Sequence, residues 1–177
     1  IRDRLSMAAK KELGDAHALD TNLVAMANAD GYSALMTGAV KCNMVLAPYN
    51  LMEVKEGNIH EIKVSEDVWP KGDTSIVGIA SEKLNEKNPE LYNAFCEATK
   101  EAMEYIEKNP EETAKILTES YDATQEEIAS WLKNEEAQYK TEVQGVMKLS
   151  QFMVEEGFLD KGPKDIKEIV FDNVKGN

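Results

Sequence analysis

The feature that most constrains the fold of this chain is a change of hydrophobic pattern near residue 80. Before it, short apolar runs alternate with amphipathic stretches, whereas after it apolar residues recur almost everywhere at helical spacing. Alternation of strands with helices predicts βαβ units and a mainly parallel sheet. We therefore expect an α/β lobe over residues 1–80, followed by an α-helical half over residues 81–177.

In the first half, the apolar runs predict strands and the amphipathic stretches predict helices. The run 41–47 holds Met44, Val45 and Leu46 in succession, which is typical of a strand buried on both faces. Pro48 then suits the first turn of a helix. The expected strands are 22–26, 41–47, 59–64 and 74–80, the expected helices are 2–13, 30–37 and 49–56, and a turn is expected at 69–73.

In the second half, the pattern predicts helices throughout. Pro89 begins a long amphipathic helix over 89–108, whose apolar face includes Leu91 and Phe95. The stretch 124–127 (TQEE) is an N-terminal signature, because the Thr124 hydroxyl can cap free amides and the glutamates interact favourably with the helix dipole. Further helices are expected at 111–121, 128–134 and 146–156, with a short apolar tail at 163–173.

Charge and composition exclude several function classes. The chain has 20 Lys and Arg against 33 Asp and Glu, a net charge of −13, which disfavours a nucleic-acid or anionic-membrane surface. Cys42 and Cys96 form no disulfide framework and no C-x-x-C motif. We interpret His17 and His60 as surface residues, and we expect no catalytic residue, metal or cofactor.

Candidate ligand-binding residues follow from the expected sheet. In open α/β sheets, ligands bind at the carboxyl ends of strands, where helix N-termini offer free amides. Tyr49 and Trp69 supply flat apolar surfaces there, although both also suit packing roles. The candidates are Pro48, Tyr49, Asn50, Trp69, Asp73 and Thr74, with Arg2 and Asp3 as secondary candidates.

Several stretches carry a family resemblance when taken in order. They are 32–40 (YSALMTGAV), 45–49 (VLAPY), 80–84 (ASEKL) with 88–91 (NPEL), and 105–114 (YIEKNPEETA). Together they resemble the second half of a periplasmic-type substrate-binding protein of ABC transporters, in the branch for nitrate, taurine, alkanesulfonates and the pyrimidine precursor of thiamine. The likeness extends from about residue 2 to about residue 171.

The resemblance implies two α/β lobes that close by a hinge on a small polar organic ligand. It implies that this chain holds the second lobe and helices that return to a first lobe, whose N-terminal part is absent from it. The implied role is an extracytoplasmic solute-binding protein of an importer, in the periplasm or as a cell-surface lipoprotein. Its partners would be the small-molecule ligand and the permease of the transporter, and no nucleic acid. It would contact the membrane only through a lipid anchor or the permease. A truncated chain could also form a dimer.

The chain also departs from the family pattern. Leu46 and Ala47 stand where the family commonly has an aromatic and an acidic residue before Pro48. Asp73 would repel an anion, which favours a neutral or cationic heterocycle as ligand. Two alternatives stay open: an enzyme of pyrimidine-precursor synthesis, which needs converging His and Cys residues or a metal, and a helical protein-interaction module.

Overall fold

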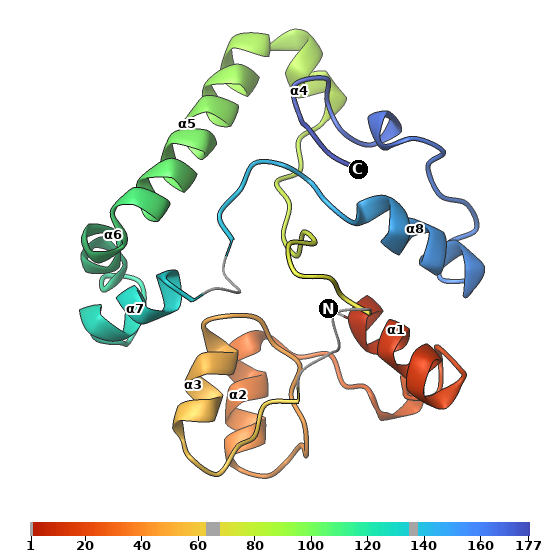
Figure 1. The fold of residues 1–177 in the computed structure, drawn as a ribbon, viewed down its shortest axis with the longest axis vertical. Coiled ribbons are helices and arrows are strands. Elements are labelled where there is room, and N and C mark those ends of the chain that lie inside the picture. Colours follow the sequence, from red (N-terminus) through yellow and green to blue (C-terminus); the bar gives the residue numbers. More distant parts are fainter. Residues whose placement is uncertain (1, 63–67, 135–137) are drawn as a thin grey trace. The chain divides into compact units, whose positions relative to one another are not determined.

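The computed structural model describes residues 2–62, 68–134 and 138–177. In these ranges the chain consists of helices joined by irregular segments (Figure 1). The elements are α1 (Arg2–Leu13), the 3₁₀ turn η1 (Asp20–Asn22), α2 (Asn28–Met36), α3 (Tyr49–Lys55), α4 (Glu82–Lys87), α5 (Pro89–Lys108), α6 (Pro110–Leu117), α7 (Gln125–Leu132), α8 (Val146–Glu155) and the 3₁₀ turn η2 (Ile166–Glu168).

The predicted α/β lobe with a mainly parallel sheet is wrong for the described part of the chain, which contains no sheet. The runs 22–26, 41–47, 59–62 and 74–80 form no strand, and positions 63 and 64 of the expected strand 59–64 lie outside the described residues. The β pairing seen in the described ranges is an isolated parallel bridge between Val143 and Gly176.

The physical reason is that a strand needs a neighbour for its backbone N–H and C=O groups. The run 74–80 has the apolar, β-branched composition of a buried strand, yet Ile76 is 77% exposed and Ile79 is 92% exposed. The β-branched composition of this run therefore indicated residues that suit a strand. Whether a strand forms depends on a second strand that pairs with it, and the described residues supply none.

The helix predictions are largely confirmed. The bounds of α1 and α5 agree with the predicted ranges, and Pro89 occupies the first turn of α5. Gly14 follows α1 with a φ of 80°, a conformation that residues with a side chain rarely adopt. Thr124 caps α7: its hydroxyl accepts a hydrogen bond from the Glu127 amide, and the Glu127 carboxylate accepts one from the Thr124 amide.

The chain divides into two compact units. Unit 1 is formed by Ile1–Lys71 and Lys148–Gly162, and unit 2 by Gly72–Met147 and Pro163–Asn177. The chain therefore leaves unit 1 after Lys71 and returns to it for one later segment that contains most of α8. The predicted division into lobes at residue 80 stays a prediction.

In unit 1, helices α2 and α3 pack against each other (Figure 1). A partly buried polar pair lies beside them: the Asn43 side-chain amide donates a hydrogen bond of 2.7 Å to the Glu53 carboxylate, and Glu53 is only 5% exposed. Gly31 on α2 approaches Asn43 closely, because a Cβ at Gly31 would lie 2.8 Å from the Asn43 amide oxygen. This close approach places a hydrogen-bonded amide over the buried carboxylate.

In unit 2, a small apolar core joins α6 to α7 through Ala114, Ile128 and Ala129. The apolar face predicted for α5 is not buried, since Leu91 is 55% exposed and Phe95 is 57% exposed. The buried aromatic residue of this helix is instead Tyr92. Amphipathic spacing thus predicted the helix correctly, although the described residues do not cover its apolar face.

Candidate functional site

The predicted ligand-binding residues are distributed over both units. Unit 1 holds Arg2, Asp3, Pro48, Tyr49, Asn50 and Trp69, and unit 2 holds Asp73 and Thr74. They were expected at the carboxyl ends of strands in a parallel sheet, and the described residues form no such sheet. The assignment of these residues to a ligand site stays a prediction.

Pro48, Tyr49 and Asn50 begin α3, with Pro48 at its N-cap position. All three are half-buried. The side-chain oxygen Oδ1 of Asn50 is buried and accepts no hydrogen bond from the described residues. A buried acceptor without a donor is costly, so this atom provides a place where a donor from a small molecule or a water would be favourable.

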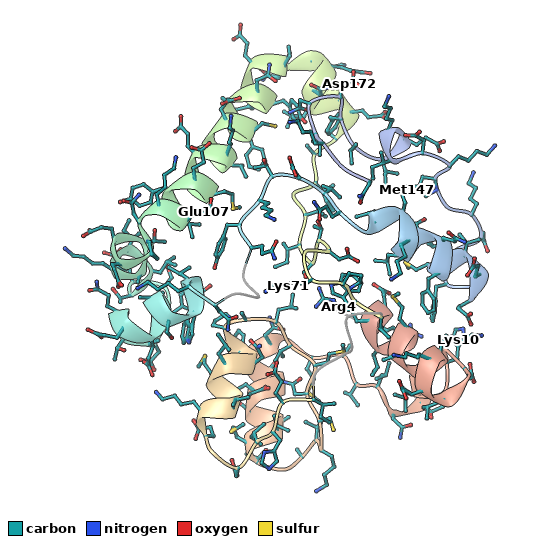
Figure 2. The ribbon with its side chains drawn as sticks, in the orientation of Figure 1. Arg4, Lys10, Lys71, Glu107, Met147 and Asp172 are labelled. Carbon is teal, nitrogen blue, oxygen red and sulfur yellow. The ribbon has the colours of Figure 1, made fainter. Side chains whose placement is uncertain are left out.

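Trp69 and Arg2 are both engaged by other side chains of unit 1. The Arg4 guanidinium lies 4.0 Å from the centroid of the Trp69 ring, a cation–π contact that occupies one face of the indole. Arg4 projects from α1 (Figure 2). Arg2 forms an ion pair of 2.8 Å with Asp20 and lies 5.3 Å from the centroid of Phe158. Asp3 stands in the first turn of α1, where a negative charge complements the helix dipole.

Asp73 and Thr74 meet the segment that precedes α8. The Thr74 amide donates a hydrogen bond of 3.0 Å to the Gln144 carbonyl, and the Gln144 amide donates one of 2.9 Å to the Thr74 hydroxyl. The Asp73 carboxyl group lies against the backbone of Gly145. The Thr74 hydroxyl therefore has a structural role as a hydrogen-bond acceptor.

A cavity of about 360 Å³ opens in unit 2 beside the corner between α4 and α5. Tyr92 and Phe171 contact each other edge to face there, with ring centroids 4.9 Å apart, and the Tyr92 hydroxyl donates a hydrogen bond of 2.7 Å to Asn173. Asp172 lies in the same loop (Figure 2). The lining residues are Asn85, Tyr92, Asn93, Val170, Phe171, Asp172 and Asn173.

The chemistry of this amide-lined cavity suits a small, flat, neutral or cationic molecule. Asparagine side chains both donate and accept hydrogen bonds, while the aromatic rings supply an apolar surface. Burial raises the pKa of Tyr92 above its ordinary value of 10, so the hydroxyl remains a hydrogen-bond donor at neutral pH. Asp172 is an acidic lining group that would repel an anion.

A second cavity, of about 350 Å³, lies near α6 and α7 in unit 2. Glu107, which lies towards the end of α5 (Figure 2), is one of its lining residues. Burial raises the pKa of Tyr139, another lining residue. The lining residues are Ile106, Glu107, Pro110, Leu132, Lys133, Asn134, Gln138, Tyr139 and Lys140. Neither cavity includes a residue that the sequence analysis selected.

Sequence reasoning missed the amide-lined cavity for a physical reason. Asn85 and Asn93 are separated from Asp172 and Asn173 by about eighty residues, and no local pattern links them. The prediction that His17 is a surface residue is confirmed by its exposure, but the sequence did not show that its ring contacts both Asp20 and the main-chain carbonyl of Glu156. The Asp20 contact had a local signal, since an acid three residues after a histidine on one turn can reach it.

The described ranges contain no group of three or more His, Cys, Asp or Glu side chains arranged to hold a metal ion. Among the helices of those ranges, none combines the length and the apolar character needed to cross a membrane. Cys42 is exposed and Cys96 is half-buried, and both are free thiols.

Comparison with known proteins places the chain in a family. A sequence model described as the NMT1-like family matches residues 9–119, which is more than half of the chain. The matched range includes the stretches at 32–40, 45–49, 80–91 and 105–114 on which the resemblance was based. Searches of curated proteins and of solved structures found no match.

Proposed function

Because the chain belongs to the NMT1-like family of periplasmic binding proteins, we propose that it acts as the solute-binding component of an ABC importer. The family match over residues 9–119 carries this proposal. In such a component, ligand binding shifts an equilibrium between open and closed forms, and the permease responds to the closed form. The proposed place of action is outside the cytoplasm, in the periplasm or at the cell surface through a lipid anchor.

The proposed ligand is a small polar organic molecule, and a neutral or cationic heterocycle fits best. Asn50 supports this choice, because its buried side-chain oxygen could accept a hydrogen bond from such a ligand, and the residue before it is the aromatic Tyr49. Asp73 supports it as well, since a carboxylate attracts a cation and repels nitrate or a sulfonate. The proposed binding residues are those selected from the sequence, led by Tyr49 and Asn50 in unit 1 and, separately, by Asp73 in unit 2.

The amide-lined cavity of unit 2 is the competing location for the same ligand. Its volume falls within the range of small-molecule sites, and asparagine side chains can both donate and accept hydrogen bonds, as an aminopyrimidine requires. The two locations share no residue. Substitutions can therefore distinguish them.

Isothermal titration calorimetry of the complete protein tests the proposal. The probes are a hydroxymethyl aminopyrimidine, thiamine, taurine, ethanesulfonate and nitrate. We expect the aminopyrimidine or thiamine to bind more tightly than any of the anions. If all five probes give no heat above that of buffer, or if the anions bind best, the proposed ligand class is wrong.

Two matched pairs of variants then locate the site. Tyr49→Ala and Asp73→Ala should weaken binding roughly tenfold or more if the sequence-selected residues bind the probe, since one lost polar contact is worth about 1.4 kcal/mol or more. Asn93→Ala and Asp172→Asn should do so instead if the amide-lined cavity binds it. Circular dichroism of each variant establishes that the helices are retained.

We propose a binding role without catalysis. The alternative is an enzyme of pyrimidine-precursor synthesis with the same family fold, which requires converging His and Cys side chains or a bound metal. Mass spectrometry of each probe after long incubation with the protein, together with metal analysis of the purified chain, separates the two. Unchanged probes support the binding role, whereas chemical conversion of a probe would establish an enzyme.

One observation favours a second function, a helical protein-interaction module. The apolar face of α5 is accessible, with Leu91 55%, Phe95 57% and Tyr105 45% exposed. Exposed apolar stripes of this kind often bind partner proteins. Phe95→Glu should abolish self-association in light scattering if this face binds a second copy, while leaving the calorimetric affinity for a small probe unchanged.

A further inference from the structure

His17 lies between two hydrogen-bond acceptors in unit 1. Its Nδ1 atom is 2.9 Å from a carboxylate oxygen of Asp20, and its Nε2 atom is 2.9 Å from the main-chain carbonyl oxygen of Glu156. A neutral imidazole has a single N–H, whereas the imidazolium has two. Only the charged form can therefore donate to both oxygens, and the neutral form would place a nitrogen lone pair against an oxygen lone pair.

The surroundings of the ring favour the charged form. Glu156 directly follows α8, so its carbonyl lies at the negative end of the helix dipole. Asp15 accepts a hydrogen bond from the His17 backbone amide and adds negative charge nearby. The Phe158 ring packs against the imidazole with centroids 4.5 Å apart.

Two cations also reach this cluster. Arg2 of α1 pairs with the same Asp20 oxygen that faces His17. Lys10 of α1 pairs with the Glu156 carboxylate at 3.0 Å. The charged groups around His17 are thus Asp15, Asp20 and Glu156, balanced in part by Arg2 and Lys10.

We propose that His17, Asp20 and Glu156 form a pH-sensitive clasp that fastens the C-terminal end of α8 to the N-terminal segment of unit 1. When His17 is protonated, the ring bridges the two segments through both nitrogens. When it loses the proton, one of the two hydrogen bonds becomes a repulsive contact, and the hold on the end of α8 weakens. Weakening of this contact would affect how residues 148–162 pack in unit 1, because this segment is separated in the sequence from the rest of the unit, residues 1–71.

The direction of the pH effect follows from linkage. The Glu156 carbonyl and then Asp20 raise the pKa of His17 above the ordinary value of 6.5. A group with a raised pKa in the folded state contributes stability below its unfolded pKa, and this contribution is lost as pH rises through the folded pKa. The clasp should therefore be closed below pH 6.5 and should open above the pKa of His17 in the folded chain.

Hydrogen exchange of the full chain tests the proposal. Protection factors for amides of residues 152–159 are measured between pH 5.5 and 9, with the intrinsic pH dependence of exchange divided out. In the wild type, these amides should lose protection as pH rises through the pKa of His17, which NMR titration of the ring measures independently. In His17→Gln, protection should be lower at acidic pH and should not change over the same range.

Two further variants keep the test decisive. Asp20→Asn retains His17 but removes the acceptor charge, so it should lower the pKa of His17 and move the loss of protection to lower pH. His60→Gln removes the other histidine and should leave the pH profile unchanged. The proposal is overturned if His17 titrates at or below 6.5, or if wild type and His17→Gln show the same pH dependence.

Discussion

Gly145 leaves the space that the carboxyl group of Asp73 occupies. A Cβ atom at position 145 would overlap the carboxyl carbon and both carboxylate oxygens of Asp73. Gly145 also has a φ of 76°, a backbone conformation that is unfavourable for residues with a side chain. Two separate constraints therefore require glycine here, and both act where residue 73 meets the segment before α8.

Replacing this glycine should destabilise unit 2. Gly145→Ala is expected to lower the free energy of unfolding by about 1–3 kcal/mol, from backbone strain together with the overlap. The combination of Asp73→Ala with Gly145→Ala should recover part of the loss, because the overlapping atoms are gone. Gly14→Ala is a control with strain alone, since nothing lies within 4 Å of its Cβ position. Urea unfolding followed by circular dichroism measures all three, and equal losses for Gly145→Ala and the double variant would contradict the overlap.

The buried carboxylate of Glu53 gives a second prediction. Asn43→Ala should destabilise unit 1 by about 1–3 kcal/mol, because it removes the donor that now bonds this carboxylate at 2.7 Å. The double variant Asn43→Ala with Glu53→Ala should cost less than the sum of the single changes, since no unpaired buried carboxylate remains. Urea midpoints of the four proteins in the cycle measure the coupling, and additive losses would show that the bond is unimportant.

The small apolar core between α6 and α7 gives a third prediction. Ile128 is 1% exposed, so Ile128→Val should cost about 0.5–1.5 kcal/mol and Ile128→Ala about 2–5 kcal/mol. Ile116 is the matched control on α6, because the same residue type is 60% exposed there and its replacement by Ala should have little effect. Thermal unfolding of the three variants checks the order, and a loss for Ile116→Ala as large as that for Ile128→Ala would mean that Ile116 is covered in solution.

Asp20 gives a prediction at acidic pH. Hydrogen bonds from His17 and then Arg2 lower the pKa of Asp20 below its ordinary value of 3.8. A group with a lowered pKa contributes stability above its unfolded pKa, and the contribution is lost as pH falls through the folded pKa. The difference in urea midpoint between wild type and Asp20→Asn should therefore be constant near pH 5 and should shrink below pH 3.8. A difference that stays constant down to pH 2 would show that Asp20 does not hold these partners in solution.

Local signals in the sequence predicted the helices well. Pro89, the Thr124–Glu127 pair and Gly14 act through atoms within one turn of the chain, so their neighbours in sequence are also their neighbours in space. The family resemblance was also available from the sequence, because ordered motifs such as that at 105–114 are read along one segment. For the candidate site, the sequence selected Tyr49, Asn50 and Asp73 through an expected sheet that the described residues do not form.

The sequence by itself therefore determined where most helices lie and to which family the chain belongs, although α6 ends at Leu117 rather than at residue 121 and α7 begins at Gln125 rather than at residue 128. Tertiary structure decided that the β-branched run 74–80 forms no strand, because a strand exists only where a second strand supplies hydrogen bonds. It also decided that Asn93 and Asn173 line one cavity, and that His17 reaches the carbonyl of Glu156. The residues of each pair are 80 and 139 positions apart in the sequence, so only the folded chain brings them together and no local propensity encodes the pairing.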